Sequence, residues 1–253
     1  MRLYAFMACL LCIVLAGIVL RNKECAWPTG GDQGHFITYA TPAYEPHAIA
    51  LCESALRVGF RSARVYTPRD IHPTFHEKHR RILGQKRGAG YWLWKPYIIH
   101  HALRDLAPGQ KLCYCDAMYQ FMVPPNLHTT TLFVNKPSQA GVTFKRKWFC
   151  KMDALKAYDV VTPSEINARQ LWAGCIYLVK NCWTDTLIQN WLEACTDPQM
   201  LTDTKSVASN APSFKDHRHD QALLDLVSKD LKVRRVESPH FLINLQSERP
   251  RAQ

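Results

Sequence analysis

The chain has 253 residues, a length that fits one globular domain or one domain with an anchor. It is 47% hydrophobic and 21% charged, as expected for a globular domain, and it contains no low-complexity tract and no repeat of solenoid or propeller period. The formal net charge is +11, and much of the basic excess lies between Arg61 and His101. This charge attracts phosphates, acidic lipids or nucleic acid, although a solvated basic face would have the same composition.

The apolar segment Leu3–Leu20 contains no charged residue. A helix of that length rises roughly 27 Å, close to the thickness of a bilayer core. We predict a signal-anchor transmembrane segment over residues 1–22. A cleaved signal peptide is the alternative, but no clear small-residue cleavage site follows the apolar run. Residues 23–34 are predicted as a short stem and residues 246–253 as a disordered tail.

Between these segments, the hydrophobic pattern alternates between strands and helices. His35–Ala40 is predicted as a strand, Glu45–Val58 as a helix ended by Gly59, and Ala63–Tyr66 as a second strand. This β-α-β opening favours a mainly parallel α/β sheet with flanking helices. Further elements are predicted in chain order as a basic helix within Asp70–Gly84, a helix from Pro96 to Leu106, strands at Lys111–Cys115, Thr131–Val134 and Leu171–Val179, helices at Thr184–Cys195 and Asp216–Lys229, and an edge strand at Leu231–Val236.

Residues 86–96, KRGAGYWLWKP, combine glycines, cations and aromatic rings directly before a predicted helix. Pro96 suits the first turn of that helix, where its missing N–H costs nothing. Arg87 and Lys95 therefore lie in the loop before this helix, and the helix leads into the predicted strand Lys111–Cys115. The aromatic rings would serve equally in a core or as stacking surfaces for bases and sugars, and they are Tyr91, Trp92 and Trp94.

Asp116 lies just past the carboxyl end of the predicted strand Lys111–Cys115. That edge of an open α/β sheet is where ligands bind. A single aspartate after a strand is also common as a turn or cap residue. The pattern places a carboxylate at a site mouth beside the cations Arg87 and Lys95.

A second polar cluster, His217, His219 and Asp220, opens the predicted helix at residue 216. Mg²⁺ and Mn²⁺ take carboxylate, phosphate and water oxygens, and Mn²⁺ also tolerates imidazole. Lys95 and Arg87 would also bind a diphosphate that is held by such an ion, and they would neutralise the charge on a departing nucleotide. Alternatively, the acids here favour the helix macrodipole and the histidines are surface residues.

The chain contains ten cysteines. Cys9 and Cys12 lie in the apolar run, and the even number that remains permits disulfides in an oxidising lumen. Cys113 and Cys115 share one face of a strand. We predict them as core residues rather than zinc ligands.

The motifs GAGYWLWKP, YCDA, ARQLWAGCIYLVKN and HRHDQALL follow one another in an order that is similar to nucleotide-diphospho-sugar transferases with a GT-A-like fold. The resemblance covers roughly His35 to Lys229. It implies a single GT-A-like, Rossmann-type domain, placed here at residues 35–245. It further implies transfer of a sugar from a nucleotide-diphosphate donor to a glycan or glycoconjugate acceptor.

The resemblance also implies roles for individual residues. Asp116 would hold the metal and diphosphate, and Asp220 and Gln221 would complete the catalytic set, with Asp220 as the base if the configuration inverts. The residues implied near the donor are Arg87, Tyr91, Trp92, Lys95, Gln170, Ala173 and Gly174.

The chain departs from the family pattern in one respect. The common Asp-x-Asp pair is reduced to the single acid Asp116. Either His219 or Asp220 completes the shell of a Mn²⁺ or Mg²⁺ ion, or Lys95 and Arg87 stabilise the leaving diphosphate without a metal. We expect a divalent metal, held by Asp116 and His219.

The prediction from these observations is a single-pass type II membrane glycosyltransferase of the Golgi or another secretory lumen, attached to the membrane by its N-terminal helix. A catalytically inactive sugar-nucleotide or glycan-binding protein on the same fold is the alternative, and the missing second aspartate favours it. A nucleic-acid binder would explain the charge, but the sequence carries no nucleic-acid motif, so no such partner is expected.

Overall fold

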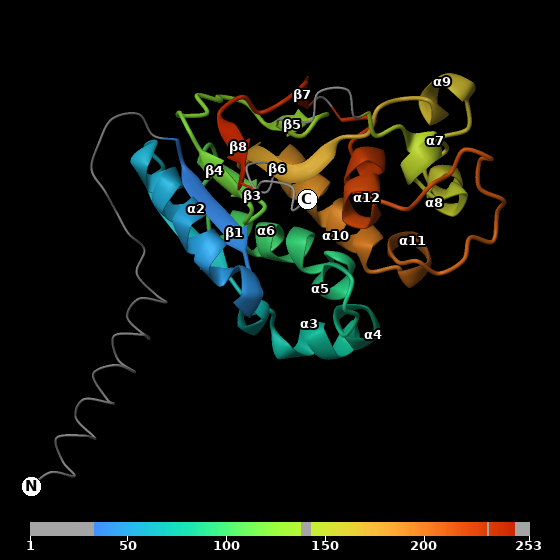
Figure 1. Ribbon diagram of the computed structural model, residues 1–253, viewed down its shortest axis with the longest axis horizontal. Helices are drawn as coiled ribbons and strands as arrows, with labels where there is room; N and C mark the ends of the chain where they lie inside the picture. The colour runs from blue at the N-terminus through green and yellow to red at the C-terminus, as the bar shows by residue number, and fades with distance from the viewer. Residues whose placement is uncertain (1–32, 138–142, 232, 246–253) are drawn as a thin grey trace, which may run out of the picture.

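The computed structural model describes residues 33–137, 143–231 and 233–245 (Figure 1). A six-stranded sheet with the order β2-β1-β3-β6-β5-β7 forms its centre. The strands are β1 (His35–Tyr39), β2 (Ser62–Tyr66), β3 (Lys111–Cys115), β5 (Thr131–Phe133), β6 (Trp172–Val179) and β7 (Arg234–Val236). β1 is parallel to β2 and β3, and β7 is parallel to β5, whereas β6 is antiparallel to both of its neighbours. The mainly parallel α/β sheet is therefore confirmed, with β6 as the exception.

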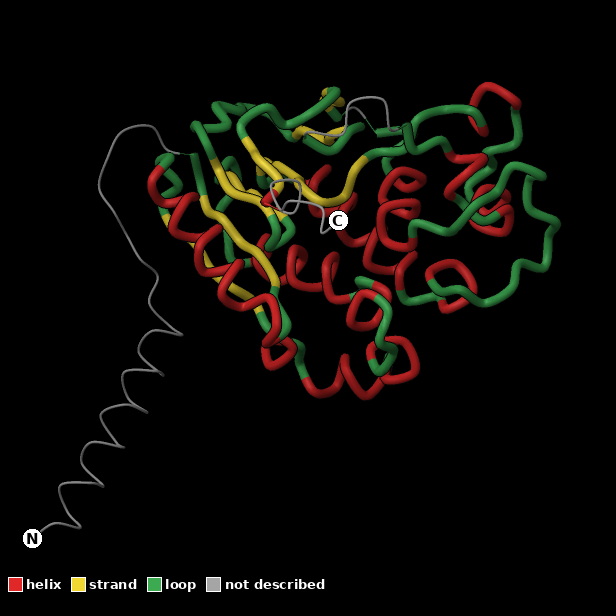
Figure 2. The backbone as a smooth tube through the Cα atoms, in the orientation of Figure 1, coloured by secondary structure: helices red, strands yellow, loops and turns green. Residues whose placement is uncertain are grey.

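A small antiparallel sheet pairs β4 (Tyr119–Phe121) with β8 (Leu242–Asn244). The helices that pack on the central sheet are α2 (Glu45–Arg57), α6 (Trp94–Arg104) and α12 (His219–Val227), and α10 (Cys182–Cys195) packs on α6 and α12. Short helices gather at one end of the molecule, far from α2 (Figure 2), and they are α7 (Arg146–Phe149), α8 (Met152–Ala157), α9 (Pro163–Ile166) and α11 (Pro198–Leu201). The remaining helical elements are η1 (Pro42–Tyr44), η2 (Pro68–Asp70), α3 (Pro73–Lys78), α4 (Arg80–Leu83) and α5 (Gly88–Tyr91).

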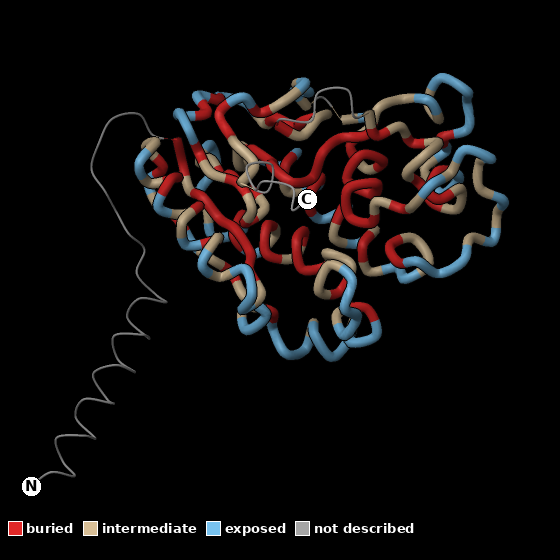
Figure 3. Tube along the Cα trace, in the orientation of Figure 1, coloured by how far each residue is buried: buried red, intermediate tan, exposed pale blue. Residues whose placement is uncertain are grey.

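The alternation of side chains along β3 divides the core into two parts. Leu112 and Tyr114 belong to the cluster that includes residues of α6, α10 and α12, whereas Cys113 and Cys115 belong to the cluster with α2, β4 and β8. The buried parts of the chain run along the sheet and the inner helices, while α3 and the start of α4 are exposed (Figure 3). The next residue on the Leu112 and Tyr114 side of the strand is Asp116, so its side chain emerges toward α6.

Several boundaries differ from the sequence-based prediction. The last helix begins at His219 and not at Asp216, because the backbone N–H groups before it bond to carbonyls of Trp148 and Phe149 instead of starting a helical turn. The predicted basic helix is split at His79, whose φ of −113° interrupts α3 and α4.

The polar segment Thr196–Pro212 is tied to α8. Lys151 is only 2% exposed, and its ammonium donates hydrogen bonds to the carbonyls of Gln199, Thr202 and Thr204. Asp153 accepts hydrogen bonds from the backbone N–H groups of Val207 and Ala208. These bonds fix the segment against the domain.

The predicted anchor at residues 1–22, nearly all of the stem and the tail at 246–253 lie outside the described residues. Within residues 33–245, excluding 138–142 and 232, the structure contains no helix of sufficient length and hydrophobicity to cross a membrane.

Candidate active site

Asp116 stands at the carboxyl end of β3, and its backbone N–H bonds to the carbonyl of Gly174 at 2.9 Å. Its Oδ1 atom accepts a hydrogen bond from the Tyr114 hydroxyl at 2.7 Å and lies 3.1 Å from Lys95 Nζ. The side chain is 37% exposed, so solvent and ligands reach it. Oδ2 has no polar partner among the residues that the structure describes. One carboxylate oxygen is therefore fixed and the other is available.

Lys95, in the first turn of α6, is 3% exposed and lies between two carboxylates. Its Nζ atom is 3.1 Å from Asp116 Oδ1 and 3.1 Å from Asp220 Oδ2, and it donates to the Ala173 carbonyl at 3.3 Å. Burial lowers the pKa of Lys95, but the two carboxylates outweigh burial, so the pKa is raised. The ammonium thus stays charged and joins three segments that are far apart in the sequence.

Asp220, near the start of α12, is 4% exposed. Burial raises its pKa to about 6, against the opposing influence of Lys95 and with a smaller contribution from Asp116 in the same direction. Lys95 approaches Oδ2 off the direction of a hydrogen bond, so this buried oxygen lacks a hydrogen-bond partner among the described residues. With both acids ionised, the cluster of Lys95, Asp116 and Asp220 carries a net charge of −1. A perturbed, buried carboxyl group beside an exposed one is typical of a functional site.

The loop before α6 has an unusual backbone. Gly88, Ala89, Gly90, Tyr91 and Trp92 all have positive φ, between 50° and 97°, so α5 is a left-handed turn. Left-handed backbone costs about 1–2 kcal/mol for each residue with a side chain. Such strain persists where the surroundings enforce it, and it gathers at functional sites.

Glycine is required at two places in this turn. A Cβ atom on Gly90 would lie 2.7 Å from Leu83 Cα, and one on Gly88 would lie 2.4 Å from the Trp92 ring. His219 has a positive φ as well, and its ring stacks on Trp92 with centroids 5.4 Å apart. The strained turn and the start of α12 therefore pack directly against each other.

Arg87 and Tyr91 hold this turn to the segment before α12. The Arg87 guanidinium bonds to both oxygens of Asp203 at 3.0 and 2.9 Å and to Asp216 at 2.6 Å, and the Tyr91 hydroxyl bonds to Asp203 at 3.0 Å. Desolvation lowers the pKa of Arg87, but hydrogen bonds to both acids outweigh it and raise the pKa. We call Arg87, Tyr91, Asp203 and Asp216 the surface clasp.

His219 lies next to the surface clasp, near Asp203 and Tyr91. Its Nδ1 atom lies 2.7 Å from the Leu201 carbonyl, and Nε2 lies 3.9 Å from Asp203. Burial lowers its pKa, so the ring is neutral near pH 7. No group of three or more potential metal-ligating side chains in the described ranges includes His219 or Asp116.

The other predicted residues line the inner side of the cluster. Gln221 Nε2 donates to Gln170 Oε1 at 3.2 Å, and Gln170 in turn donates to the Phe149 carbonyl at 3.1 Å. Ala173 and Gly174 lie where the register between β5 and β6 shifts, and their carbonyls bond to Lys95 and to the Asp116 N–H. A Cβ on Gly174 would come within 2.3 Å of Trp172, so tight packing alone explains this glycine.

Two cations near the cluster of Lys95, Asp116 and Asp220 were missed by the sequence analysis. Lys136 and Arg218 are half-buried, each lies over the Phe144 ring, and neither forms an ion pair within the described part of the chain. Arg218 Nε is buried without a hydrogen-bond partner there. Burial lowers the pKa of Lys136 while Asp116 acts in the opposite direction. Only folding brings Lys136 from the β5 side and Arg218 from the α12 side together, so no local pattern signals them.

A basic and aromatic surface adjoins these cations. The ammonium groups of Lys145, Lys147 and Lys215 lie 5.4, 5.6 and 5.0 Å from the ring centre of Trp148. Phe149, the next residue, receives hydrogen bonds at its carbonyl from Gln170 and Arg218. We call these three lysines and Trp148 the Trp148 platform.

The donor set at Asp116 fits a divalent cation that is bound mainly through ligand and water oxygens. Mg²⁺ commonly uses one or two carboxylates, several waters and substrate phosphates. Asp116 Oδ2 is the free carboxylate oxygen here, and the net negative charge of the cluster favours a cation. Two cavities of about 410 Å³ lie elsewhere, one beside Arg146 and Arg235 and one beside Tyr158 and Leu226.

No family model matches the chain, and no protein of curated function matches its sequence. Among solved structures, it is similar to the glycosyltransferase GlyE of Streptococcus pneumoniae TIGR4, with 11% identity over 82% of this chain and a TM-score of 0.42. The matched part is 46% of the GlyE chain.

It is also similar to the galactosyltransferase LgtC, which was solved with donor and acceptor sugar analogs. The match has 11% identity and a TM-score of 0.40, and it covers 76% of this chain and 70% of the LgtC chain. Mouse xyloside xylosyltransferase 1 is similar as well, with 9% identity and a TM-score of 0.37. The match covers 81% of this chain and 84% of the xylosyltransferase chain. Each of these proteins is a glycosyltransferase, the class to which the sequence motifs are similar. The function of this chain is argued below from its own residues.

Proposed function

We propose that the protein is a glycosyltransferase that moves a sugar from a nucleotide-diphosphate donor to a glycan or glycoconjugate acceptor. The observation that supports this most strongly is the convergence of Asp116 and Asp220 on the buried ammonium of Lys95. Burying the charges of Lys95 and Asp220 costs stability unless their geometry is well satisfied, and a hydrophobic core would need neither of them. A half-exposed acid at the carboxyl edge of the sheet, above such a cluster, suits donor binding.

The donor diphosphate would lie at Asp116. A divalent ion on Asp116 Oδ2 would supply charge neutralisation of the phosphate oxygens. Lys95 and Arg87 are engaged with carboxylates, so their role in this proposal is to position Asp116, Asp220 and the left-handed turn. Direct contact with the phosphates falls to Lys136 and Arg218, which form no ion pair within the described ranges.

Asp220 has the pKa that general-base chemistry needs. A carboxyl group with a pKa of about 6 is ionised at neutral pH and still basic enough to accept a proton. In an inverting reaction, Asp220 takes the proton of the acceptor hydroxyl as that oxygen bonds to the anomeric carbon. The bond from the anomeric carbon to the phosphate oxygen breaks, and its electron pair leaves with the nucleoside diphosphate.

The Trp148 platform is the proposed acceptor surface. Sugars stack on aromatic faces, and three lysines around one indole favour an acceptor that carries acidic groups. The platform adjoins Gln170 and Gln221, and thus the inner side of the site, through the Phe149 carbonyl.

An inactive binding protein on the same fold is the second candidate, because only one acid, Asp116, follows β3 where the family pattern has two. The membrane anchor, the type II orientation and the Golgi or other secretory lumen remain part of the proposal. They rest on Leu3–Leu20 alone.

The test is turnover of a panel of nucleotide sugars by the full chain with Mn²⁺ or Mg²⁺, followed as release of the nucleoside diphosphate with and without glycan acceptors. Release that Asp116→Asn abolishes would support the transferase. Nucleotide binding without release in any combination would support the binding protein, and neither binding nor release would contradict both.

A further inference from the structure

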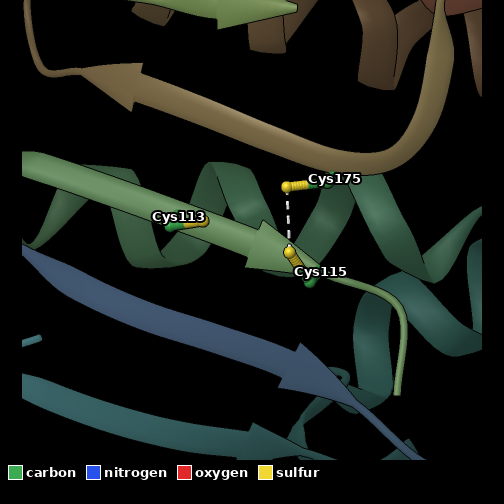
Figure 4. A group of neighbouring side chains, drawn as sticks. All are labelled: Cys113, Cys115 and Cys175. Carbon is green, nitrogen blue, oxygen red and sulfur yellow. Dashed lines mark hydrogen bonds between the residues drawn. The ribbon is translucent and has the colours of Figure 1, made fainter. Parts of the chain in front are cut away.

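Three cysteines meet inside the central sheet. β3 supplies Cys113 and Cys115, β6 supplies Cys175, and the three sulfur atoms lie within 4.8 Å of one another (Figure 4). All three side chains are 0% exposed. The sulfur of Cys115 donates to that of Cys175 at 2.9 Å. Burial agrees with the prediction of Cys113 and Cys115 as core residues, but the meeting of three cysteines across two strands calls for a chemical explanation.

The strand register places Cys115 directly opposite Cys175. The neighbouring pair, Asp116 and Gly174, is joined by a backbone hydrogen bond of 2.9 Å. Because the two kinds of pair alternate along an antiparallel ladder, Cys115 and Cys175 form a non-hydrogen-bonded pair, with Cα atoms about 4.5 Å apart. Disulfides join Cα atoms separated by about 4.4–6.8 Å. A bond between these two cysteines therefore requires no movement of the strands.

The surroundings of the sulfurs favour a neutral product. The core cluster around the sulfurs includes Phe36, Trp172 and Tyr177, all buried. Three thiolates around Zn²⁺ or Cu⁺ would bring net negative charge into this apolar region, where an uncompensated charge is costly. A disulfide carries no charge and buries no unsatisfied donor.

We propose that Cys115 and Cys175 form a cross-strand disulfide when the chain folds in an oxidising compartment. The oxidant is an external disulfide, of glutathione or of a disulfide-exchange enzyme. One cysteine thiolate attacks it and releases one external thiol. The second cysteine thiolate then displaces the other, so that two cysteine thiols give one S–S bond and two external thiols.

The reaction precedes closure of the sheet. In the folded chain, burial raises the pKa of Cys115 and of Cys175 well above the ordinary value, and neither sulfur reaches solvent. Thiolates attack disulfides and neutral buried thiols do not. Once formed, the bond is protected, and it ties the residue before Asp116 to the residue after Gly174. The inference does not depend on the proposed glycosyl transfer.

The test is to refold the denatured full chain either in a buffer of oxidised and reduced glutathione or with excess reductant. Free thiols are then blocked with an alkylating agent under denaturing conditions, and the peptides are identified by mass spectrometry. Chymotrypsin cleaves after Tyr114 and so separates Cys113 from Cys115. The expected product is a peptide pair linked through Cys115 and Cys175, with Cys113 alkylated.

The crosslink also has a thermal signature. It joins residues 60 apart, so the oxidised chain should melt about 10 °C above the reduced chain. Cys175→Ala should lose most of this difference, whereas Cys195→Ala, an equally buried cysteine in the other core cluster, should keep it. Alkylated Cys115 and Cys175 after oxidative refolding, linkage through Cys113, or one equivalent of metal bound in place of the bond would each overturn the inference.

Discussion

Replacement of Lys95 by methionine tests the charge cluster on which the site depends. Methionine keeps most of the volume and removes the ammonium, so Asp116 and the 4% exposed Asp220 face each other without a cation. Removing one partner of a buried ion pair costs about 3–5 kcal/mol. Asp116 is 37% exposed and is partly solvated, so we expect the lower end, about 3 kcal/mol at pH 8.

The free energy of unfolding lost in Lys95→Met should depend on pH, and the protonation of Asp220 sets the direction of that dependence. The folded pKa of about 6 lies above the unfolded value, so the folded chain binds this proton more tightly and stability falls as pH rises from about 4 to 6. Because Lys95 lowers the pKa of Asp220, removal of Lys95 raises this pKa further. The pH range over which stability falls then extends to higher pH. At pH 5, Asp220 of the variant is neutral, and the loss should shrink to about 1 kcal/mol.

The assay is urea denaturation of the full chain at pH 5, 6, 7 and 8, with Lys151→Met as the matched control. Lys151 is equally buried, but its ammonium bonds to three carbonyls and to no carboxylate. Its loss should therefore change little between pH 5 and pH 8. An equal loss for Lys95→Met at all four values would refute the reasoning.

Four further results are expected. Asp116→Asn should lower turnover at least about 100-fold and barely change the melting temperature, because the variant keeps the shape of a half-exposed side chain and Lys95 keeps its pair with Asp220. Gly90→Ala should destabilise the fold by more than Gly109→Ala, because both residues have positive φ but only Gly90 would meet backbone, at 2.7 Å from Leu83 Cα; equal losses measured by denaturation would exclude the clash. The rate should fall as pH drops below about 6, where Asp220 takes up a proton and can no longer act as a base, and a rate unchanged from pH 5 to pH 8 would remove Asp220 from that role. Lys136→Gln and Arg218→Gln should each weaken nucleoside diphosphate binding in calorimetry by about tenfold, the loss of one charge-assisted bond, whereas Lys78→Gln on exposed α3 should have no effect.

The order of strands and helices was predictable because it rests on local periodicity. The helix at Glu45 and its end at Gly59 follow from apolar spacing and from a residue that tolerates φ of 97°. The strand Lys111–Cys115 was predicted at its observed bounds. The antiparallel direction of β6 was not predicted, since strand direction depends on the long path between residues 115 and 172 and not on the residues of the strand.

The site was predictable in its residues more than in its contacts. Asp116, Lys95 and Asp220 were named from motifs, and the structure brings them to one point. The sequence also assigned Arg87 to the diphosphate, but it does not reveal that Asp203 and Asp216 occupy this guanidinium. Tertiary pairing between charges more than 100 residues apart leaves no local signal, and the same limit hid Lys136 and Arg218.

Isothermal titration of the full chain with nucleoside diphosphates and Mn²⁺ tests the donor site most directly. Wild-type protein should bind at least one of them, and Asp116→Asn should weaken that binding tenfold or more. Asp185→Asn, which also breaks a lysine–aspartate pair at a similarly exposed carboxylate, should leave it unchanged. Wild-type protein that binds no nucleoside diphosphate, or an Asp116→Asn variant that binds as tightly as wild type, would contradict the placement of the donor at Asp116.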